Sequence, residues 1–334
     1  MKRTILLFTT TLFAAPGWTP QSSGVTARLR GVSAVSERVA WASGTGGVIL
    51  RTADSGQHWQ RLAIPGAEKL DFRDIDAVDE RTAYVLSIGP GDASRIYKTT
   101  DAGANWHLQF TNSDPHAFFD ALAFWTPRRG IAISDSVDGL FVILLTNDGG
   151  RTWIRVAAER LPPALPGEGA FAASGTNVTV HGQQHVWIGT GAGRVLRSSD
   201  GGQHWQIAAT GLARSATAGI FSIAFRDARH GIVVGGDYKQ EAAAIDNVAV
   251  TGDGGRTWRL ARGLTGFRSV VAWLPQSKPP AWLAVGPSGA DLSPDDGETW
   301  RAVSGTGSHA FSPSPQGGIG WGVGEDGRID RWRW

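Results

Sequence analysis

The sequence predicts an all-β fold, a seven-bladed β-propeller with its ring closed by the N-terminal strand. Three observations support this prediction. An eight-residue phrase occurs six times, an apolar segment precedes each copy and occurs a seventh time, and the seventh unit lacks its last strand. A repeat of about 40 to 50 residues with a turn motif in each unit is typical of a propeller with one four-stranded blade per repeat.

The repeated phrase has the pattern Ser/Thr-x-Asp-x-Gly-x-x-Trp, and its copies start 42 to 53 residues apart. Its aspartate can accept hydrogen bonds from nearby backbone N–H groups, its glycine tolerates a positive φ, and its tryptophan can fill the gap between blades. Because six equivalent copies cannot form one active site, we interpret the aspartates as structural. We call these segments the box turns: Thr52–Trp59, Thr99–Trp106, Thr146–Trp153, Ser198–Trp205, Thr251–Trp258 and Ser293–Trp300, with Asp54, Asp101, Asp148, Asp200, Asp253 and Asp295.

The box turns resemble the Asp-box, or bacterial neuraminidase repeat (BNR). The chain as a whole is similar to the non-sialidase branch of these proteins, the photosystem II stability/assembly factor-like propellers of bacteria and plastids. The resemblance covers nearly the whole chain beyond the first residues. It implies a propeller but leaves the function open, since sialidases, carbohydrate-binding propellers and assembly factors all carry the box.

The number of apolar segments upstream of the box turns predicts the number of blades. Their equivalent positions are Trp41, Tyr84, Ile131, Trp187, Ile232, Trp282 and Trp321, which makes seven units.

The two chain ends are expected to share one blade. A box turn follows 11 residues after Trp41, Trp187 and Trp282, whereas the chain ends at Trp334, soon after the corresponding position in the seventh unit. The segment 18–24 precedes the first inner strand (Leu29–Val35) as the residues from Trp59 precede the second (Phe72–Val78). We therefore expect residues 18–24 to supply the missing outer strand, which removes exposed sheet edges.

The first residues are expected to direct export. Lys2 and Arg3 precede the apolar run Ile5–Ala15, which matches a secretory signal and is too short to span a bilayer. We expect residues 1–17 to be a signal peptide and residues 18–334 to be one propeller domain, periplasmic or secreted, with no membrane insertion after cleavage. The absence of cysteine suits export without dependence on oxidation.

Composition argues against several partners and cofactors. The formal net charge is +2 with no basic cluster, so we expect no nucleic-acid partner. His181 and His185 have a spacing that zinc can use, but no third ligand accompanies them, and no nucleotide-binding phrase is followed by a helix. We expect a monomer without metal or cofactor.

Unequal loop lengths place the expected binding surface on the face opposite the box turns. The connection between second and third strands lengthens at Gly89–Ser94, Asp135–Phe141 and Asp237–Asn247, and the longest crossover between blades is Ala157–Ala170. Loops on a rigid scaffold commonly carry function. We expect a protein or an extended ligand to bind there, with candidate contacts from Asp135, Asp138, Glu168, Asp237, Tyr238 and Lys239. The resemblance points to the same segments, because related propellers carry motifs like Gly235–Tyr238, Asp135–Gly139 and Gly167–Phe171.

The sequence leaves more than one function open. Phe72-Arg73 and Phe225-Arg226 approach the arginine phrase of sialidases but lack its proline, and we attribute both to one inner-strand position shared by the blades. A glycosidase could use Glu168 with Asp135 or Asp237 if their carboxyl groups faced each other about 5–10 Å apart. We favour a non-enzymatic propeller, an assembly or stability factor for an envelope complex by its resemblance. The alternative is a glycoside hydrolase-like enzyme or a carbohydrate-binding propeller using these carboxylates.

Overall fold

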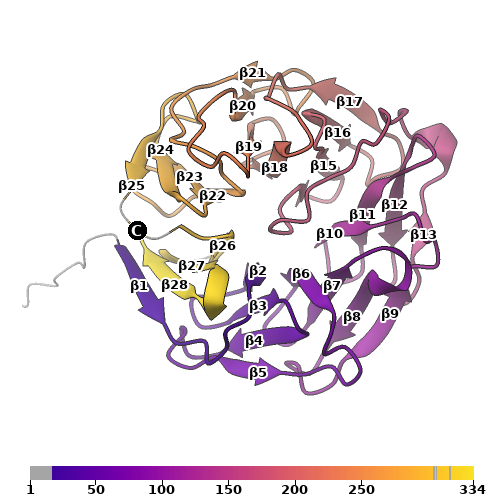
Figure 1. The fold of residues 1–334 in the computed structure, drawn as a ribbon, viewed down its shortest axis with the longest axis vertical. Coiled ribbons are helices and arrows are strands. Elements are labelled where there is room, and N and C mark those ends of the chain that lie inside the picture. The colour runs from indigo at the N-terminus through magenta and orange to yellow at the C-terminus, as the bar shows by residue number, and fades with distance from the viewer. Residues whose placement is uncertain (1–16, 304, 306, 316) are drawn as a thin grey trace, which may run out of the picture.

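Seven four-stranded antiparallel sheets form a ring around a central axis in the computed structural model, which describes residues 17–303, 305, 307–315 and 317–334 (Figure 1). The predicted seven-bladed propeller is confirmed. The expected signal peptide falls outside the described residues except for Gly17, which begins the first strand. In the described part of the chain, no helix has the length and apolar character needed to cross a membrane.

Six blades take their four strands in chain order from the axis outward. Blade 1 has β2 (Leu29–Ala34), β3 (Ala40–Gly44), β4 (Val48–Thr52) and β5 (Gln60–Leu62); blade 2 has β6 (Asp71–Ala77), β7 (Ala83–Ile88), β8 (Arg95–Thr99) and β9 (His107–Thr111); blade 3 has β10 (Phe119–Phe124), β11 (Gly130–Val137), β12 (Leu140–Thr146) and β13 (Ile154–Arg155). Blade 4 has β14 (Val178–His181), β15 (His185–Gly189), β16 (Arg194–Ser198) and β17 (Gln206–Ala209); blade 5 has β18 (Ala218–Phe225), β19 (Gly231–Asp237), β20 (Val248–Thr251) and β21 (Arg259–Leu260); blade 6 has β22 (Val270–Leu274), β23 (Ala281–Gly286), β24 (Gly289–Ser293) and β25 (Arg301–Val303). Three short 3-10 helices lie in connections: η1 (Gly91–Ala93), η2 (Ala158–Arg160) and η3 (Glu325–Gly327).

Blade 7 joins the two chain ends, as the sequence predicts. Its inner three strands are β26 (Ala310–Pro313), β27 (Ile319–Val323) and β28 (Ile329–Arg333), and β1 (Gly17–Gln21) pairs antiparallel with β28 as the outer strand. Trp18 stacks on Trp332 with ring centroids 5.6 Å apart. The Gln21 amide oxygen accepts hydrogen bonds from the indoles of Trp59 (3.1 Å) and Trp321 (3.2 Å), so one side chain joins blade 7 to blade 1.

The box turns share one hydrogen-bond pattern. In the first, the Thr52 hydroxyl donates to Asp54 Oδ1 (2.9 Å) and accepts from the Gly56 N–H, while the His58 N–H donates to the same Asp54 oxygen (2.9 Å). The other five turns repeat these bonds with their own Ser or Thr, Asp and Gly residues. All six aspartates are thus occupied in closing their own turns, which supports the structural interpretation.

The apolar core lies in layers between neighbouring blades. Box tryptophans contribute to these layers: Trp205 packs with residues of blades 3 and 4, and Trp300 with residues of blades 5 and 6. Each blade is therefore stabilised by burial against both neighbours.

The two faces of the ring carry different connections. In blade 1, Thr52 at the box turn pairs with Ala40 of the second strand, which pairs with Ala34 at the end of the inner strand. At the opposite edge of the blade, Leu29 at the start of the inner strand pairs with Gly44, which pairs with Val48 of the third strand. The starts of the inner strands and the connections between second and third strands therefore share the face opposite the box turns. On that face, residues 135–141 form an extension of the β11–β12 hairpin rather than a loop, because Val137 pairs with Leu140.

Gln21 is expected to contribute to stability through ring closure. Gln21→Ala removes the acceptor of two indole N–H groups and should lower the free energy of unfolding by about 1–3 kcal/mol. Urea denaturation measures the change, and Gln57→Ala, at an exposed position of the first box turn, is the control. Equal effects of the two substitutions would contradict this role.

Acid should weaken the box turns. Hydrogen bonds from the backbone and side chain four residues later lower the pKa of Asp54, Asp101 and Asp148 to about 2. A carboxyl with a depressed folded-state pKa stabilises the fold above its unfolded pKa of about 4, and that contribution is lost as pH falls toward 2.

The free energy of unfolding of the wild type should therefore fall between pH 4 and pH 2. Urea unfolding measures this free energy at each pH. The free energy should change less with pH in the triple variant Asp54→Asn, Asp101→Asn, Asp148→Asn than in the wild type. The same change with pH in both proteins would show that the box aspartates are not responsible.

Candidate functional site

A cavity of about 550 Å³ opens at the axis on the face opposite the box turns. All seven blades or their adjoining segments contribute to its lining, including Arg30, Arg73, Asp120, Phe221 and His309. Its size falls within the range typical of ligand-binding pockets, about 300–1,000 Å³.

β-bulges direct four of these side chains to the cavity. The pairing of first and second strands shifts register between Leu29 and Gly31, between Phe72 and Asp74, between Phe119 and Ala121, and between Ile220 and Ser222. Bulges re-aim the extra residue and are common next to functional sites. The residues at the four shifts are Arg30, Arg73, Asp120 and Phe221, and all four line the cavity.

Cationic groups gather where blades 7, 1 and 2 meet. Arg28 pairs with Glu325 (2.8 Å), and Arg73 donates to Asp71 (2.9 Å) and to the carbonyl of Ala172 (2.9 Å). The Nε of Arg30 is buried without a hydrogen-bond partner in the described structure. Burial and the charges of Arg73 and Arg28 lower the pKa of Arg30 to about 10, which still leaves it cationic at neutral pH.

His309 completes this group in neutral form. Its Nε2 lies 2.7 Å from Glu325, but burial and the charge of Arg30 lower the pKa of His309 to about 4. Its Nδ1 is also buried and unpaired within the described residues.

Asp120 is a buried carboxyl without protein partners. The residue is 0% exposed, and neither carboxyl oxygen has a hydrogen-bond partner among the described residues. Burial and the nearby charge of Asp135 raise the pKa of Asp120 well above its usual value. A buried polar group without a partner destabilises a protein, so its presence at a cavity suggests selection for a purpose other than stability.

Aromatic rings line the opposite side of the cavity, on blades 4 to 6. Phe171 stacks on Phe221 with centroids 4.0 Å apart, and Phe267 and Tyr238 meet Phe221 edge-on at 4.6 and 6.1 Å. These phenylalanines form a cluster separate from the core layers between blades, and Tyr238 is 39% exposed. We call Phe171, Phe221, Tyr238 and Phe267 the aromatic patch.

Two of the six candidate residues from the sequence lie at this cavity. Tyr238 and Lys239 follow β19 and line it together, with the Lys239 ammonium 5.4 Å from the centre of the Tyr238 ring. Asp237 instead closes the turn, because its Oδ1 accepts a hydrogen bond from the Lys239 N–H (2.9 Å).

Asp135 and Glu168 line an adjoining cavity and accept hydrogen bonds from the crossover between blades 3 and 4. Asp135 Oδ1 accepts from the Ala170 N–H (2.9 Å). Glu168 is 3% exposed, and its carboxylate accepts hydrogen bonds from Thr190 (2.7 Å), the Leu165 N–H (2.9 Å) and the Arg194 guanidinium. Asp138 lies apart from both, with φ of 53° at the tip of the β11–β12 hairpin.

This arrangement does not suit a glycosidase acid at Glu168. Burial acts to raise the pKa of Glu168, but the hydrogen bonds from Arg194, Leu165 and Thr190 outweigh it and hold that pKa below its usual value. A general acid needs a raised pKa. The described residues also contain no group of three or more His, Cys, Asp or Glu side chains that could hold a metal ion.

Comparison of the two Phe-Arg phrases corrects one interpretation from the sequence. Phe72 lies near the start of β6, opposite Ser87, and Arg73 lines the cavity. Phe225 instead ends β18, opposite Gly231, and Arg226 pairs with Asp296 (2.8 Å) in a box turn on the other face. The two phrases therefore occupy different positions of their blades, and the expectation of one shared position was wrong.

Arg30, Asp120 and Phe221 were not predicted as site residues from the sequence, and Arg73 was considered only as part of a sialidase-like phrase, because the unequal loop lengths drew attention to the loops rather than to the inner strands. A usable signal was present. Three of the four are charged residues at one position of the inner strands, and in β2 and β10 they are the only charged residues of the strand.

The fold and this cavity define a seven-bladed propeller with an arginine- and phenylalanine-lined cavity at one mouth of its axis. No protein-family model matches the chain. The chain is homologous to the chloroplastic photosystem II stability/assembly factor HCF136 of Arabidopsis thaliana. They share 23% identity over 245 residues, and the match covers 59% of each protein, so the chain spans less than two thirds of this relative.

Solved structures show the same architecture. A structure described as YCF48 bound to D1 peptide superposes with a TM-score of 0.67 at 15% identity, covering 95% of this chain and 97% of the other. YCF48 from Cyanidioschyzon merolae gives a TM-score of 0.67 at 17% identity, covering 95% and 98%. At these identities the two structures show the fold alone, and HCF136 is described as a stability/assembly factor.

Asp120→Asn should stabilise the protein at neutral pH. A carboxyl whose folded pKa is raised loses stability as pH rises above its unfolded pKa of about 4, and a neutral amide avoids that loss. We expect a gain of about 1–3 kcal/mol in the free energy of unfolding at pH 7, shrinking as pH falls toward 4. Asp138→Asn, at an exposed turn, is the control and should change little. A loss of stability at pH 7 would mean that Asp120 has a favourable partner.

Proposed function

We propose that this protein is an exported, non-enzymatic propeller that binds a polypeptide segment of a client protein in the central cavity. Its role would be to assist the assembly or stability of a protein complex in the cell envelope. One observation carries the proposal: the cavity opposite the box turns joins the aromatic patch to a group of arginines. Aromatic and arginine side chains dominate the binding energy of protein interfaces.

The cavity offers an extended polypeptide two kinds of contact. The aromatic patch presents apolar surface to side chains, with the Tyr238 ring partly exposed. Across the axis, Arg30 retains an unpaired N–H to donate to carbonyl or carboxylate oxygens, and Asp120 retains two acceptor oxygens for N–H groups. Buried groups of this kind discriminate strongly between ligands that pair with them and ligands that do not.

The comparisons support a polypeptide over a glycan as the ligand. HCF136 is a photosystem II stability/assembly factor, and the YCF48 structure is described with a bound D1 peptide. Export is supported by the basic and apolar residues at the N-terminus, and amino-terminal sequencing of the protein from an envelope fraction would test it.

A peptide array of envelope proteins from the host tests the proposal. The purified full chain should bind a subset of the peptides, and Tyr238→Ala and Arg73→Gln should each weaken the best peptide by about tenfold or more, as expected for interface anchors. Fluorescence anisotropy of the labelled peptide measures the change. Arg151→Gln, in a box turn on the opposite face, is the control and should bind like the wild type.

Two outcomes would contradict the proposal. One is a peptide whose affinity falls in Arg151→Gln but not in Tyr238→Ala or Arg73→Gln. The other is hydrolysis of a glycan in a substrate panel by the wild type but not by Glu168→Gln, which would favour the glycosidase alternative.

A further inference from the structure

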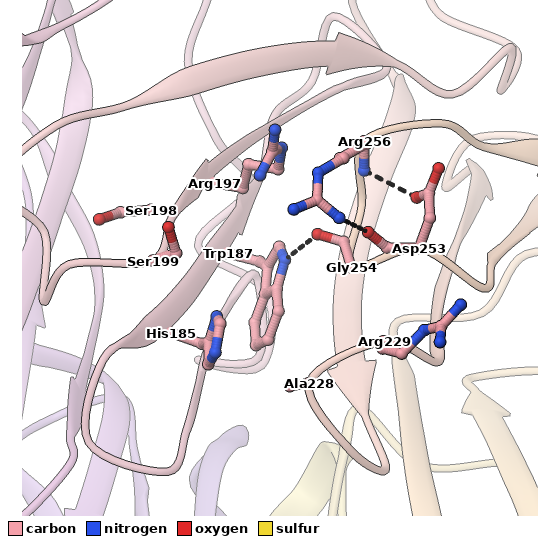
Figure 2. A pocket seen from close by; sticks show the side chains of 10 residues that line it. All are labelled: His185, Trp187, Arg197, Ser198, Ser199, Ala228, Arg229, Asp253, Gly254 and Arg256. Atoms are coloured by element: carbon pink, nitrogen blue, oxygen red, sulfur yellow. Dashed lines mark hydrogen bonds between the residues drawn. The ribbon is translucent and has the colours of Figure 1, made fainter.

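A second cavity lies on the other face of the ring, between blades 4 and 5 (Figure 2). Its volume is about 370 Å³, and its lining includes Arg197 of β16, Arg229 of the β18–β19 turn and Arg256 of the fifth box turn. The only carboxylate among the lining residues is Asp253. The lining therefore carries a clear excess of positive charge, unlike the chain as a whole.

The single carboxylate is already occupied. Asp253 accepts hydrogen bonds from the Thr251 hydroxyl (2.9 Å), from the N–H groups of Arg256 (2.9 Å) and Thr257 (3.0 Å), and from the Thr257 hydroxyl (2.7 Å). It is thus committed to the box turn.

The three guanidinium groups have few partners. Arg197 donates to the side-chain oxygen of Gln206, Arg229 to the carbonyl of Gly252 (3.3 Å) and Arg256 to the carbonyl of Asp253 (2.9 Å). Within the described residues, none of the three forms an ion pair with a carboxylate. A guanidinium has five N–H donors, so most of their donors are free.

Arg197 and Arg256 approach each other across the cavity. Figure 2 shows the guanidinium of Arg256 extending toward that of Arg197, above the Trp187 ring. Consistent with this, burial and the charge of Arg256 lower the pKa of Arg197. Two like charges held close together are stabilised when an anion lies between them.

At the equivalent position between blades 2 and 3, the cationic side chain has different hydrogen-bond partners. There Tyr84 replaces Trp187, Lys98 replaces Arg197 and Arg151 replaces Arg256. The Lys98 ammonium donates to the carbonyl of Gly149 (2.9 Å) and lies 5.0 Å from the centre of the Tyr84 ring, so its charge is satisfied by the protein. The Gly149 carbonyl also accepts from the Tyr84 hydroxyl (2.8 Å). Between blades 4 and 5 the matching carbonyl, that of Gly254, accepts from the Trp187 indole (2.9 Å), whereas the Arg197 guanidinium donates to the Gln206 side chain and not to this carbonyl.

We propose that Arg197 and Arg256, with Arg229 at the rim, bind a small oxyanion, a phosphoryl group or a carboxylate, on the box-turn face. Arginine matches both groups because its planar fork can donate two parallel hydrogen bonds to their oxygens. This site is independent of the central cavity and of the polypeptide proposed to bind there.

The test uses the full chain with inorganic phosphate, citrate and chloride at equal ionic strength. Titrations followed by ¹⁵N NMR of the arginine side chains should show saturable shifts at Arg197 and Arg256 with phosphate or citrate and none with chloride. Tighter binding of phosphate identifies a phosphoryl ligand, and tighter binding of citrate a carboxylate; either result supports the site.

Variants decide whether the oxyanion is held by this cavity. Arg197→Gln and Arg256→Gln should each weaken binding by about tenfold or more, from the loss of a charge-assisted hydrogen bond. Arg151→Gln, at the same box-turn position in blade 3, should bind like the wild type. Arg256 is exposed, so its variant should fold even if Arg197→Gln does not.

Saturable shifts in no titration would overturn the proposal. So would equal binding by Arg256→Gln and Arg151→Gln, which would mean an adventitious ion only. Peptide affinity at the central cavity should be unchanged in Arg256→Gln, so failure here is distinguishable from failure of the proposed polypeptide site.

Discussion

Closure of the ring is the constraint on which the rest of the structure depends. No blade buries both of its faces alone, and the core lies in layers between neighbours. The ring therefore needs a seventh blade that contacts both the sixth and the first. The chain builds it from its two ends, with β1 paired to β28 and Gln21 joined to tryptophans of both blades. The first and last strands of the described chain are thus joined by one antiparallel pair.

Closure also fixes where function can reside. Seven inner strands start at one mouth of the axis, so any side chain that a bulge turns inward meets its counterparts from other blades. Arg30, Arg73, Asp120 and Phe221 are brought together in this way although they are far apart in sequence. The box turns lie on the opposite face, where the second cavity, between blades 4 and 5, is lined by arginines of both blades.

The repeat made the fold predictable from the sequence. The box turns indicated the strand order of each blade. The seventh unit lacks an outer strand and residues 18–24 precede the first unit, so the N-terminal segment was predicted to close the ring. The face that carries the long connections also followed, because strand direction alternates within a blade.

The site was less predictable because burial depends on neighbouring blades. Glu168 was a candidate contact because it lies in the longest crossover, but it is buried and pairs with Arg194 of blade 4, 26 residues later. Asp237 likewise serves its own turn, whereas Tyr238 and Lys239 line the cavity. The bulges that direct Arg73 and Asp120 to the cavity arise from strand register, which the spacing of the repeats does not reveal.

Hydrogen–deuterium exchange of the protein with and without a bound client peptide tests the central claim most directly. The account predicts slower exchange at the starts of the inner strands, in residues 28–31, 71–74, 118–121 and 219–222, and in the segment 237–241. Exchange in the box turns should stay the same. Slower exchange confined to the box turns, with the inner-strand starts unchanged, would contradict the account.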